Sequence, residues 1–360
     1  MLRERDGTPA RVDVVPGMRV AVVLVNWNGW RECIECLDTL LPQAHDSFHV
    51  FVVDNASTDG SVERIVAWCH APTADASWRR HCGVARLTDR SPAPPVQCRI
   101  AAQSATALPA PQGGCRLTIV RCTENRGFAA GCNRGMVAAG LGEFDYFWLL
   151  NPDTTVAQHA LTELLARAAA SPRVGMVGST IRYYDRPEIV EALGGARLDR
   201  SSGATSHIGQ GERADDTPVD AAAVEREMAY VMGASMLVRA TFVREVGLMQ
   251  EDYFLYFEEI DWVLRARGRF LLGFAPRSQV FHKSGANSRK AAPLLSTRFY
   301  YRNRLRFVAR FMPEHLTAAK WQMVKDMLRQ IARGQWPYVR IVLSTLINAG
   351  SITAGVVPYS

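Results

Sequence analysis

The sequence of 360 residues lacks several features that would place a protein in a specialised class. Its first eighteen residues, MLRERDGTPARVDVVPGM, contain no apolar segment of the kind that a secretory signal peptide has. The eight cysteines do not follow the compact, regular spacing of a disulfide-stabilised secreted domain. We therefore expect a globular protein of the reducing cytoplasm.

The chain also lacks a convincing membrane span and the two standard phosphate-binding loops. The C-terminal stretch YVRIVLSTLINAGSITAGVV is interrupted by an arginine, polar residues and two glycines, so it fits an interfacial helix better than a spanning one. The glycines of ENRGFAAGCNRG (Glu124–Gly135) match neither G-x-G-x-x-G nor a Walker A loop. A nucleotide, if bound, must be held in another way.

Acidic residues are scarce in one region of the chain. Between Phe281 and Arg340 there are thirteen Lys and Arg residues but only two acids, a net charge of +11. Because the whole chain carries +7, the remainder carries about −4. A basic region of this kind favours an anionic partner, such as a nucleic acid, a phospholipid surface or a diphosphate.

Apolar runs and amphipathic stretches alternate along the chain in the order strand, helix, strand, helix. RVAVVLVNWNG and FHVFVVDNASTDGS are typical of buried parallel strands that end in polar turns, and helical spacing follows each of them. This alternation predicts an α/β fold with a Rossmann-like, mostly parallel central sheet flanked by helices. We expect an N-terminal extension (1–18), a sheet domain (19–292) and a helical, basic C-terminal region (293–360).

Two segments interrupt this alternation. Residues 69–116 are rich in Ala, Pro, Ser and Arg without a sustained period, so we predict an insertion or a surface excursion there. Residues 185–217 form a polar, glycine-rich segment to which the pattern assigns no elements.

Polar side chains stand at the carboxyl ends of three predicted strands: Asn26, Asp54 and Asp153. Asp153 belongs to the tripeptide Asn-Pro-Asp, which directly follows the strand FDYFWLL. An Asn-Pro-Asp turn is common and is weak evidence alone. However, open α/β sheets bind ligands beyond the carboxyl ends of their strands. Three oxygen-bearing side chains at that edge indicate a nucleotide and a hard divalent cation, because Mg²⁺ takes carboxylate and phosphate oxygens.

Three acids crowd into YFEEIDW, at the predicted start of a helix: Glu258, Glu259 and Asp261. Acids in a first turn can simply complement the helix dipole. Here the flanking residues are aromatic and aliphatic, which would raise the pKa of a carboxylate and suit it to act as a base. The segment is therefore a candidate catalytic site, with the choice among the three acids open.

Two further positions are weaker candidates. His282 follows an apolar strand, where a structural role is the commoner one, but its strand can reach the same sheet edge. Asn125 and Arg126 precede a predicted small-residue helix, whose positive N-terminus could face an anionic ligand.

Seven motifs in order resemble those of the family 2 inverting glycosyltransferases, and most closely the rhamnosyltransferase-like branch that acts in the synthesis of cell-surface polysaccharides such as O-antigen and cell-wall polymers. They are VVLVNWNG, VVDNASTDGS, ENRGFAAGCNRG, LLNPDTTV, the stretch from VMGASMLVR to EEIDWVLRARG, VFHKSG and YYRNRLRFV. The resemblance covers about Arg19 to Phe311, apart from the insertion, and implies a GT-A fold.

The resemblance also implies roles for individual residues. The residues that would bind the nucleotide-sugar are Asn26, Asp54, Asn125, Arg126 and Asn151. Asp153 matches the last acid of the metal-binding D-x-D motif, whose first acid is here Asn151, and His282 would reach the metal or the diphosphate. The family's base, the second acid of E-D-x-D, falls on Glu259, which is a Glu rather than an Asp. Glu258 and Asp261 therefore remain alternatives.

The resemblance implies an Mg²⁺- or Mn²⁺-dependent enzyme that transfers a sugar to a lipid-linked saccharide at the inner face of the cell membrane. The favoured donor is dTDP-L-rhamnose. The alternatives are a UDP-hexose or UDP-galactofuranose with the same chemistry. A more distant alternative is a nucleic-acid-binding protein, although the basic region contains no recognisable nucleic-acid-binding module.

The basic region contains one regular feature: Arg298, Arg302, Arg306 and Arg310 recur every four residues on a predicted helix. No acid lies between Asp261 and Glu314, so these side chains would repel one another without an anionic neighbour. An anionic bilayer surface would supply that neighbour. We therefore expect the stripe to contribute to peripheral membrane binding.

Overall fold

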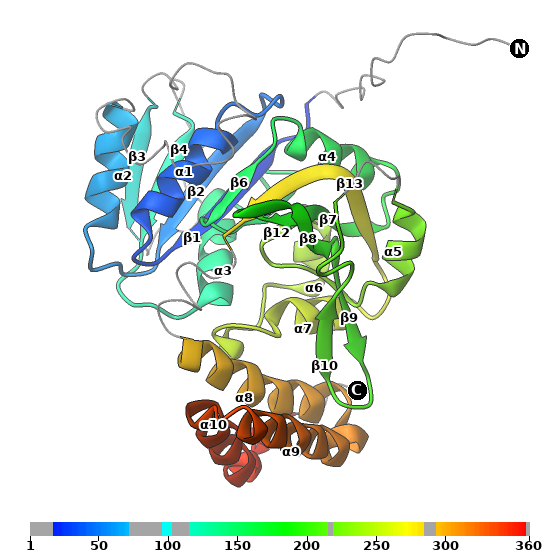
Figure 1. The fold of residues 1–360 in the computed structure, drawn as a ribbon. Helices are drawn as coiled ribbons and strands as arrows, with labels where there is room; N and C mark the ends of the chain where they lie inside the picture. Colours follow the sequence, from blue (N-terminus) through cyan, green and yellow to red (C-terminus); the bar gives the residue numbers. More distant parts are fainter. Residues whose placement is uncertain (1–16, 72–95, 103–114, 215–218, 284–292, 358–360) are drawn as a thin grey trace, which may run out of the picture.

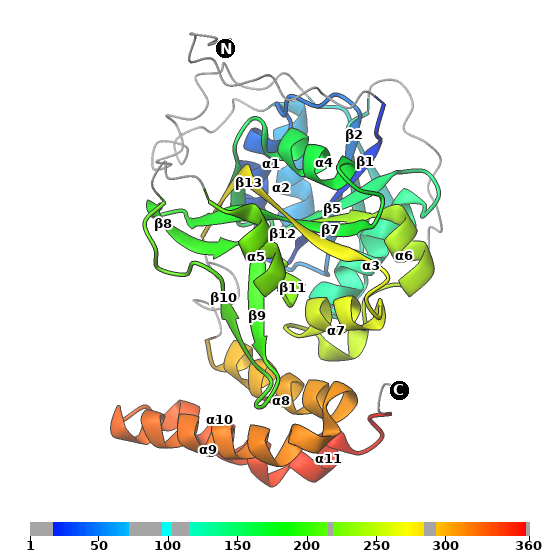
Figure 2. The same cartoon turned by 90° about the vertical axis from the view of Figure 1, so that its right-hand side faces the viewer.

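The computed structural model describes residues 17–71, 96–102, 115–214, 219–283 and 293–357, which form a sheet-containing part and a group of C-terminal helices (Figure 1). In the first part, helices cover both faces of a twisted sheet. The C-terminal helices lie together beyond one end of this part, on the side to which β9, β10 and α7 extend (Figure 2).

Within the described residues the main sheet has ten strands in the order β3-β4-β2-β1-β5-β12-β7-β13-β6, with β8 added beside β7. They are β1 (Val20–Asn26), β2 (Phe48–Asp54), β3 (Cys98–Ala102), β4 (Leu117–Arg121), β5 (Tyr146–Leu150), β6 (Thr154–Val156), β7 (Val174–Tyr183), β8 (Arg186–Leu193), β12 (Ser235–Arg239) and β13 (Leu271–His282). The run from β3 to β5 is parallel, and β12 is antiparallel to its neighbours.

A second, three-stranded sheet of the described chain has the order β10-β9-β11. Its strands are β9 (Gly195–Asp199), β10 (Ala204–His207) and β11 (Tyr230–Val231). The helices of the sheet-containing part are α1 (Trp30–Leu40), α2 (Ser61–His70), α3 (Phe128–Ala139), α4 (Ala160–Ala169), α5 (Ala221–Glu227), α6 (Ala240–Val246) and α7 (Glu258–Arg265). The C-terminal helices are α8 (Pro293–Phe311), α9 (Leu316–Ala332), α10 (Trp336–Ile347) and α11 (Ala349–Thr353).

The strands of the main sheet are apolar on both faces because helices cover both faces. In β1, Val22 and Leu24 pack into the core cluster that includes residues of α1, α2 and α4, whereas Val23 packs with residues of α3 and α6. A strand buried on both faces therefore reads as a continuous apolar run rather than as an alternating one. The predicted α/β class with a mostly parallel sheet is confirmed.

Glycines let α3 lie directly on β1. A Cβ at Gly131 would come within 2.5 Å of Val25 Cγ1, and one at Gly135 within 2.3 Å of Val23 Cγ1. The small residues of GFAAGCNRG thus serve a close helix–sheet contact.

Three predictions about local structure were wrong. Residues 98–102, placed in the insertion, form the edge strand β3. All five are partly or fully exposed, so no apolar period marked them. Most of the remaining insertion lies outside the described residues. Residues 185–217 contain β8, β9 and β10, whose polar faces hid their strand character. After Asn-Pro-Asp the sequence predicts a helix over 156–170, but the chain first forms β6, so α4 begins at Ala160.

The arginine stripe of α8 has protein partners that the sequence analysis did not anticipate. Arg306 lies 3.5 Å from Asp252, and Arg310 lies 3.1 Å from Asp261. Each acid precedes its arginine partner by about fifty residues and lies outside α8, so spacing along the helix could not reveal it. The stripe as a whole therefore does not require an external anion, contrary to the expectation from the sequence.

A search of the described helices for one that could cross a bilayer, by length and apolar character, finds none.

Candidate active site

The carboxyl ends of three parallel strands meet at one edge of the main sheet. β1 lies between β2 and β5, and the registers pair Asn26 with Asp54 and Leu24 with Leu150. Asn26 and Asp54 therefore end their strands side by side. Asn151 and Asp153 directly follow β5, so they lie at the same edge of the sheet.

Asn26 is fully buried at this edge and leaves one acceptor unused. Its amide nitrogen donates to Oδ1 of Asp54 (3.1 Å) and to Oγ of Ser57 (3.2 Å), while Oδ2 of Asp54 accepts from the backbone nitrogen of Ser57 (3.0 Å). Oδ1 of Asn26 has no hydrogen-bond partner among the described residues. Because a buried carbonyl oxygen without a donor is costly, this atom is suited to accept a hydrogen bond from a ligand.

Asn125 and Arg126 have protein partners of their own at the start of α3. Oδ1 of Asn125 accepts from the backbone nitrogen of Gly127 (2.9 Å), which shapes the turn into the helix. The Arg126 guanidinium lies 3.3 Å from Glu251 and 3.6 Å from Glu124, and its side chain is 57% exposed. These contacts give both residues a structural explanation.

Asp153 and His282 meet because β13 pairs with β6, which sets His282 opposite Thr154. Nε2 of His282 lies 3.3 Å from Oδ1 of Asp153, and Nδ1 lies 2.9 Å from Oε2 of Glu191. All three residues are buried. Glu191 was not selected from the sequence, because it lies on β8 in the polar segment 185–217 and no local motif marks it.

The charge states of His282 and Asp153 depend on this contact. Burial lowers the pKa of His282, but Asp153 and Glu191 outweigh burial through charge and hydrogen bonds and raise that pKa to about 10. Burial raises the pKa of Asp153, but His282 and Lys283 bring it below its usual value. With this pKa the imidazole carries a proton on both nitrogens at neutral pH. A cation that binds Nε2 would have to displace its proton, while Nδ1 stays held by Glu191 as it is in metal-binding histidines.

These residues fit a divalent cation that substrate oxygens also bind. Mg²⁺ usually takes one or two carboxylates together with phosphate oxygens and water, and imidazole is a ligand for transition metals. Among the described residues, no group of three or more His, Cys, Asp or Glu side chains is arranged to hold a cation by itself. Asp153 and His282 could therefore supply two protein ligands to a cation that arrives with a diphosphate.

Glu258 and Glu259 begin α7 and differ in environment. Glu258 is 1% exposed, and its Oε2 has no hydrogen-bond partner among the described residues. Burial and the neighbouring charge of Glu259 raise the pKa of Glu258 well above its usual value. Glu259 is half-buried beside Gly233, and burial raises its pKa to about 7. Of the two, Glu259 therefore has the more accessible carboxylate and the pKa suited to a base near neutral pH.

The loop before these acids is strained. Phe254, Tyr256 and Phe257 all have positive φ angles (65°, 69° and 76°), which non-glycine residues rarely adopt. Such strain costs roughly 1–3 kcal/mol per residue and persists only where the surroundings impose it. It is common at active sites.

Asn303 of α8 holds this loop and was missed by the sequence analysis. It is fully buried, and its amide nitrogen donates to the carbonyl oxygens of Tyr253 (2.6 Å), Leu255 (2.8 Å) and Tyr256 (3.2 Å). Phe299 of the same helix stacks on Phe254, with ring centroids 4.7 Å apart. The C-terminal helix thus supports the loop that positions Glu258 and Glu259.

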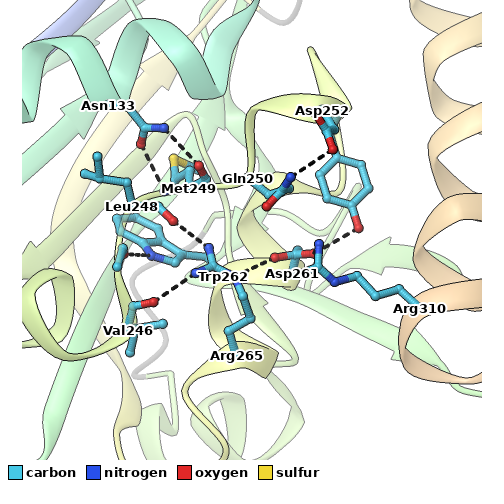
Figure 3. Close-up of polar contacts among 12 residues, drawn as sticks. Asn133, Val246, Leu248, Met249, Gln250, Asp252, Asp261, Trp262, Arg265 and Arg310 are labelled. Atoms are coloured by element: carbon cyan, nitrogen blue, oxygen red, sulfur yellow. Dashed lines mark hydrogen bonds and ion pairs between the residues drawn. The ribbon is translucent and has the colours of Figure 1, made fainter. Parts of the chain in front are cut away.

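Asp261, the third acid of the segment, is fully buried in a network of its own (Figure 3). Oδ1 accepts from Nε of Arg265 (2.7 Å), while Oδ2 accepts from the Tyr253 hydroxyl (3.0 Å) and lies 3.1 Å from the Arg310 guanidinium. Because both oxygens have cationic partners, this carboxylate is poorly suited to accept a substrate proton. Its contacts instead join α7 to α8.

A cavity of about 550 Å³ brings the candidate groups together. Its lining includes Asn151, Asp153, Glu191, His282, Glu258 and Glu259. It also includes residues of the C-terminal helices: Tyr300 and Tyr301 of α8, Gln330 of α9 and Tyr338 of α10. The other residues selected from the sequence are outside this lining: Asn26, Asp54, Asn125, Arg126 and Asp261.

Comparison with known sequences gives one family and two curated relatives. Residues 101–202 match the sequence model of the family described as Glycosyl transferase family 2. The relatives are N-acetylglucosaminyl-diphospho-decaprenol L-rhamnosyltransferases of Mycobacterium tuberculosis strains CDC 1551/Oshkosh and ATCC 25618/H37Rv, each 27% identical over 180 residues. The match covers 44% of this chain and 56% of each relative, so the chain spans about half the length of the curated relatives it matches.

Two solved structures resemble the fold. A mannosyltransferase from Pyrobaculum calidifontis, solved with GDP-mannose and Mn²⁺, has a TM-score of 0.50 and 16% identity over 97% of this chain and 91% of that one. GalNAc-T7, solved with UDP, GalNAc and Mn²⁺, has a TM-score of 0.53 and 13% identity over 83% of this chain and 49% of that one. At these identities the likeness concerns the fold alone. Residues 101–202 are thus similar in sequence to glycosyltransferase family 2, and the chain as a whole has the mixed α/β, GT-A-like fold of these two structures.

Proposed function

We propose that this protein is a metal-dependent, inverting glycosyltransferase of family 2 that moves a sugar from a nucleoside diphosphate to a lipid-linked saccharide at the inner face of the cell membrane. The observation that carries the proposal is that one cavity contains both the Asp153–His282 pair and Glu259. The Asp153–His282 pair suits a diphosphate with its cation, and Glu259 suits the removal of a proton from an acceptor hydroxyl.

The donor side of the site would be built at the carboxyl edge of the sheet. Asn26 and Asp54 would hold the nucleotide, with the unused Oδ1 of Asn26 as an acceptor. Asn151 would lie near the diphosphate. Asp153 and His282 would hold Mg²⁺ or Mn²⁺, which when bound neutralises charge on the diphosphate leaving group. Asn125 and Arg126 would contribute by shaping the start of α3.

On the acceptor side, Glu259 would remove the proton of the attacking hydroxyl. The acceptor oxygen then forms a bond to the anomeric carbon from the face opposite the diphosphate. The bond from that carbon to the diphosphate oxygen breaks, and the diphosphate leaves with the electron pair. The proton remains on Glu259. Attack from the opposite face inverts the anomeric configuration.

The donor we favour is dTDP-L-rhamnose. Support comes from the two M. tuberculosis relatives, whose names specify rhamnosyl transfer to a decaprenol-linked acceptor. A lipid-linked acceptor is also consistent with a cavity that the C-terminal helices partly line. UDP-hexoses and UDP-galactofuranose remain the alternatives for the donor.

A donor panel tests this choice. The purified full chain is heated with dTDP, UDP or GDP, each with Mg²⁺ or Mn²⁺ and again with a chelator. We expect dTDP to raise Tm by a few degrees in the presence of metal, since a ligand at about 100 times its Kd adds about 2.7 kcal/mol of stability. A larger shift with UDP would indicate the UDP-sugar alternative. An electrophoretic shift with nucleic acid and no shift with any nucleotide would contradict the proposed function.

Asn303 provides a second test, because it should control the position of Glu259. Asn303→Asp keeps the shape of the side chain but replaces the amide donor with an acceptor facing three carbonyl oxygens. We expect kcat to fall roughly 10²-fold, as expected for displacement of a catalytic group by about 1 Å, with donor affinity unchanged. Steady-state kinetics and calorimetric titration of the nucleotide measure the two effects.

The matched control is Asn348→Asp, the same substitution at an exposed position of the C-terminal helices. It should leave kcat near that of the wild type. If Asn303→Asp is folded, binds donor and retains full kcat, the hydrogen bonds of Asn303 do not position Glu259.

A further inference from the structure

The C-terminal helices expose an unusual amount of apolar surface. Seven of the thirteen large hydrophobic side chains that are exposed in the described chain lie between Trp321 and Val357. On α10, Trp336, Leu343 and Ile347 are 58%, 45% and 74% exposed, and on α9, Trp321 and Leu328 are 64% and 56% exposed. Clustered apolar exposure of this kind marks an interaction surface.

Helical spacing places these side chains on one face of each helix. Trp321 and Leu328 are seven residues apart on α9. On α10, Leu343 and Ile347 follow Trp336 by seven and eleven residues. Other positions of the same helices, Met323 on α9 and Val342 on α10, are fully buried against the protein. The exposed residues are therefore a second apolar face and not the edge of the core. We call these five residues the outer apolar face.

The charges on this part of the chain are almost all basic. Between Leu316 and Val357 there are five basic residues: Lys320, Lys325, Arg329, Arg333 and Arg340. Lys325 and Arg340 each follow the tryptophan of their helix by four residues, so they lie beside the outer apolar face. The one acid, Asp326, lies 3.4 Å from the buried Arg304 and 3.1 Å from Arg329. An anionic partner would complement this charge.

We propose that the outer apolar face and its basic residues bind the surface of an anionic lipid bilayer. Exposed Trp and Leu beside Lys and Arg are the composition of helices that lie in a membrane interface. Tryptophan favours this region because its ring is apolar while its N–H remains hydrated.

The location of the face relative to the cavity fits this partner. Gln330 of α9 and Tyr338 of α10 line the cavity, and both flank the turn between the two helices. By helical spacing these two side chains point away from the outer apolar face, so α9 and α10 would contact the bilayer with one side and line the cavity with the other. In this respect the inference rests on the proposed function and deepens it. The membrane contact would then lie on α9 and α10 and not on the arginine stripe of α8.

Vesicle flotation of the full chain tests the proposal without donor or acceptor. We expect binding to vesicles of phosphatidylcholine mixed with phosphatidylglycerol, weaker binding to phosphatidylcholine alone, and weakening by salt. Lys325→Glu with Arg340→Glu should lower the partition coefficient by at least about 25-fold, because loss of each basic residue near the surface costs about fivefold and the added carboxylates are repelled as well. Trp336→Ala with Leu343→Ala should lower it roughly tenfold.

Matched controls lie outside the C-terminal helices. Leu271→Ala removes a side chain of comparable exposure (43%), and Arg173→Glu with Arg244→Glu makes the same charge change at exposed positions. Both controls should bind vesicles like the wild type.

Two outcomes would overturn the proposal. One is a wild-type chain that floats with neither kind of vesicle. The other is a wild-type dimer in sedimentation that Trp336→Ala with Leu343→Ala dissociates, with vesicle binding unchanged, which would assign the face to a second copy of the chain. These assays contain no substrate, so neither outcome tests the proposed function. That function is tested separately by the release of nucleoside diphosphate.

Discussion

Asp153→Ala is expected to abolish sugar transfer together with the metal dependence of donor binding. The substitution removes the carboxylate that lies 3.3 Å from His282 in the cavity and leaves the imidazole as the one proposed protein ligand from this pair. Charge stabilisation by a metal ion is worth several kcal/mol in a transition state, so turnover should fall about 10³-fold or more. Release of nucleoside diphosphate measures turnover, and calorimetry with and without Mn²⁺ measures donor binding.

Two variants control this result. Asp185→Ala removes an exposed carboxylate from the β7–β8 turn and should leave both measurements unchanged. Asn151→Asp should keep activity, since it restores the acid that is commoner at the first position of the D-x-D motif. Metal-dependent turnover near that of the wild type in a folded Asp153→Ala variant would place the cation elsewhere.

Glu259→Gln should lower kcat by roughly 10²–10⁴ while donor affinity changes little. The amide keeps the shape of the side chain but cannot accept the acceptor's proton. Glu258→Gln and Asp261→Asn are the matched comparisons. Asp261→Asn should mainly lower Tm, because Arg265 and Arg310 would lose a buried anionic partner. If one of these two comparison variants loses kcat at unchanged Tm while Glu259→Gln does not, the base is assigned wrongly.

The pH dependence of kcat/KM gives an independent readout of the same assignment. Burial raises the pKa of Glu259 to about 7, so the carboxyl is protonated below that pH and is a base above it. The rate should therefore rise as pH increases through about 7 and then level off. Glu259→Gln should lack this ascending limb, whereas Asn303→Asp should retain it with a lower plateau or a shifted midpoint.

Local sequence by itself determined the alternating strands and helices and the polar residues at the strand ends. Val20–Asn26 and Phe48–Asp54 are recognisable because strands covered on both faces must be apolar throughout. Asp153 was found because its turn follows such a strand directly. These features depend on neighbouring residues, so periodicity and turn chemistry reveal them.

The tertiary structure alone decided which side chains complete the site. Glu191 supports His282 across 91 residues, and Asn303 reaches the loop at Tyr253 across 50. The same applies to Asp261, which the sequence groups with Glu258 and Glu259. Its partners, Arg265 and Arg310, make it a link between helices. The physical reason is that a hydrogen bond or ion pair depends on distance in space, which residues on separate elements acquire only when the sheet and the C-terminal helices pack together.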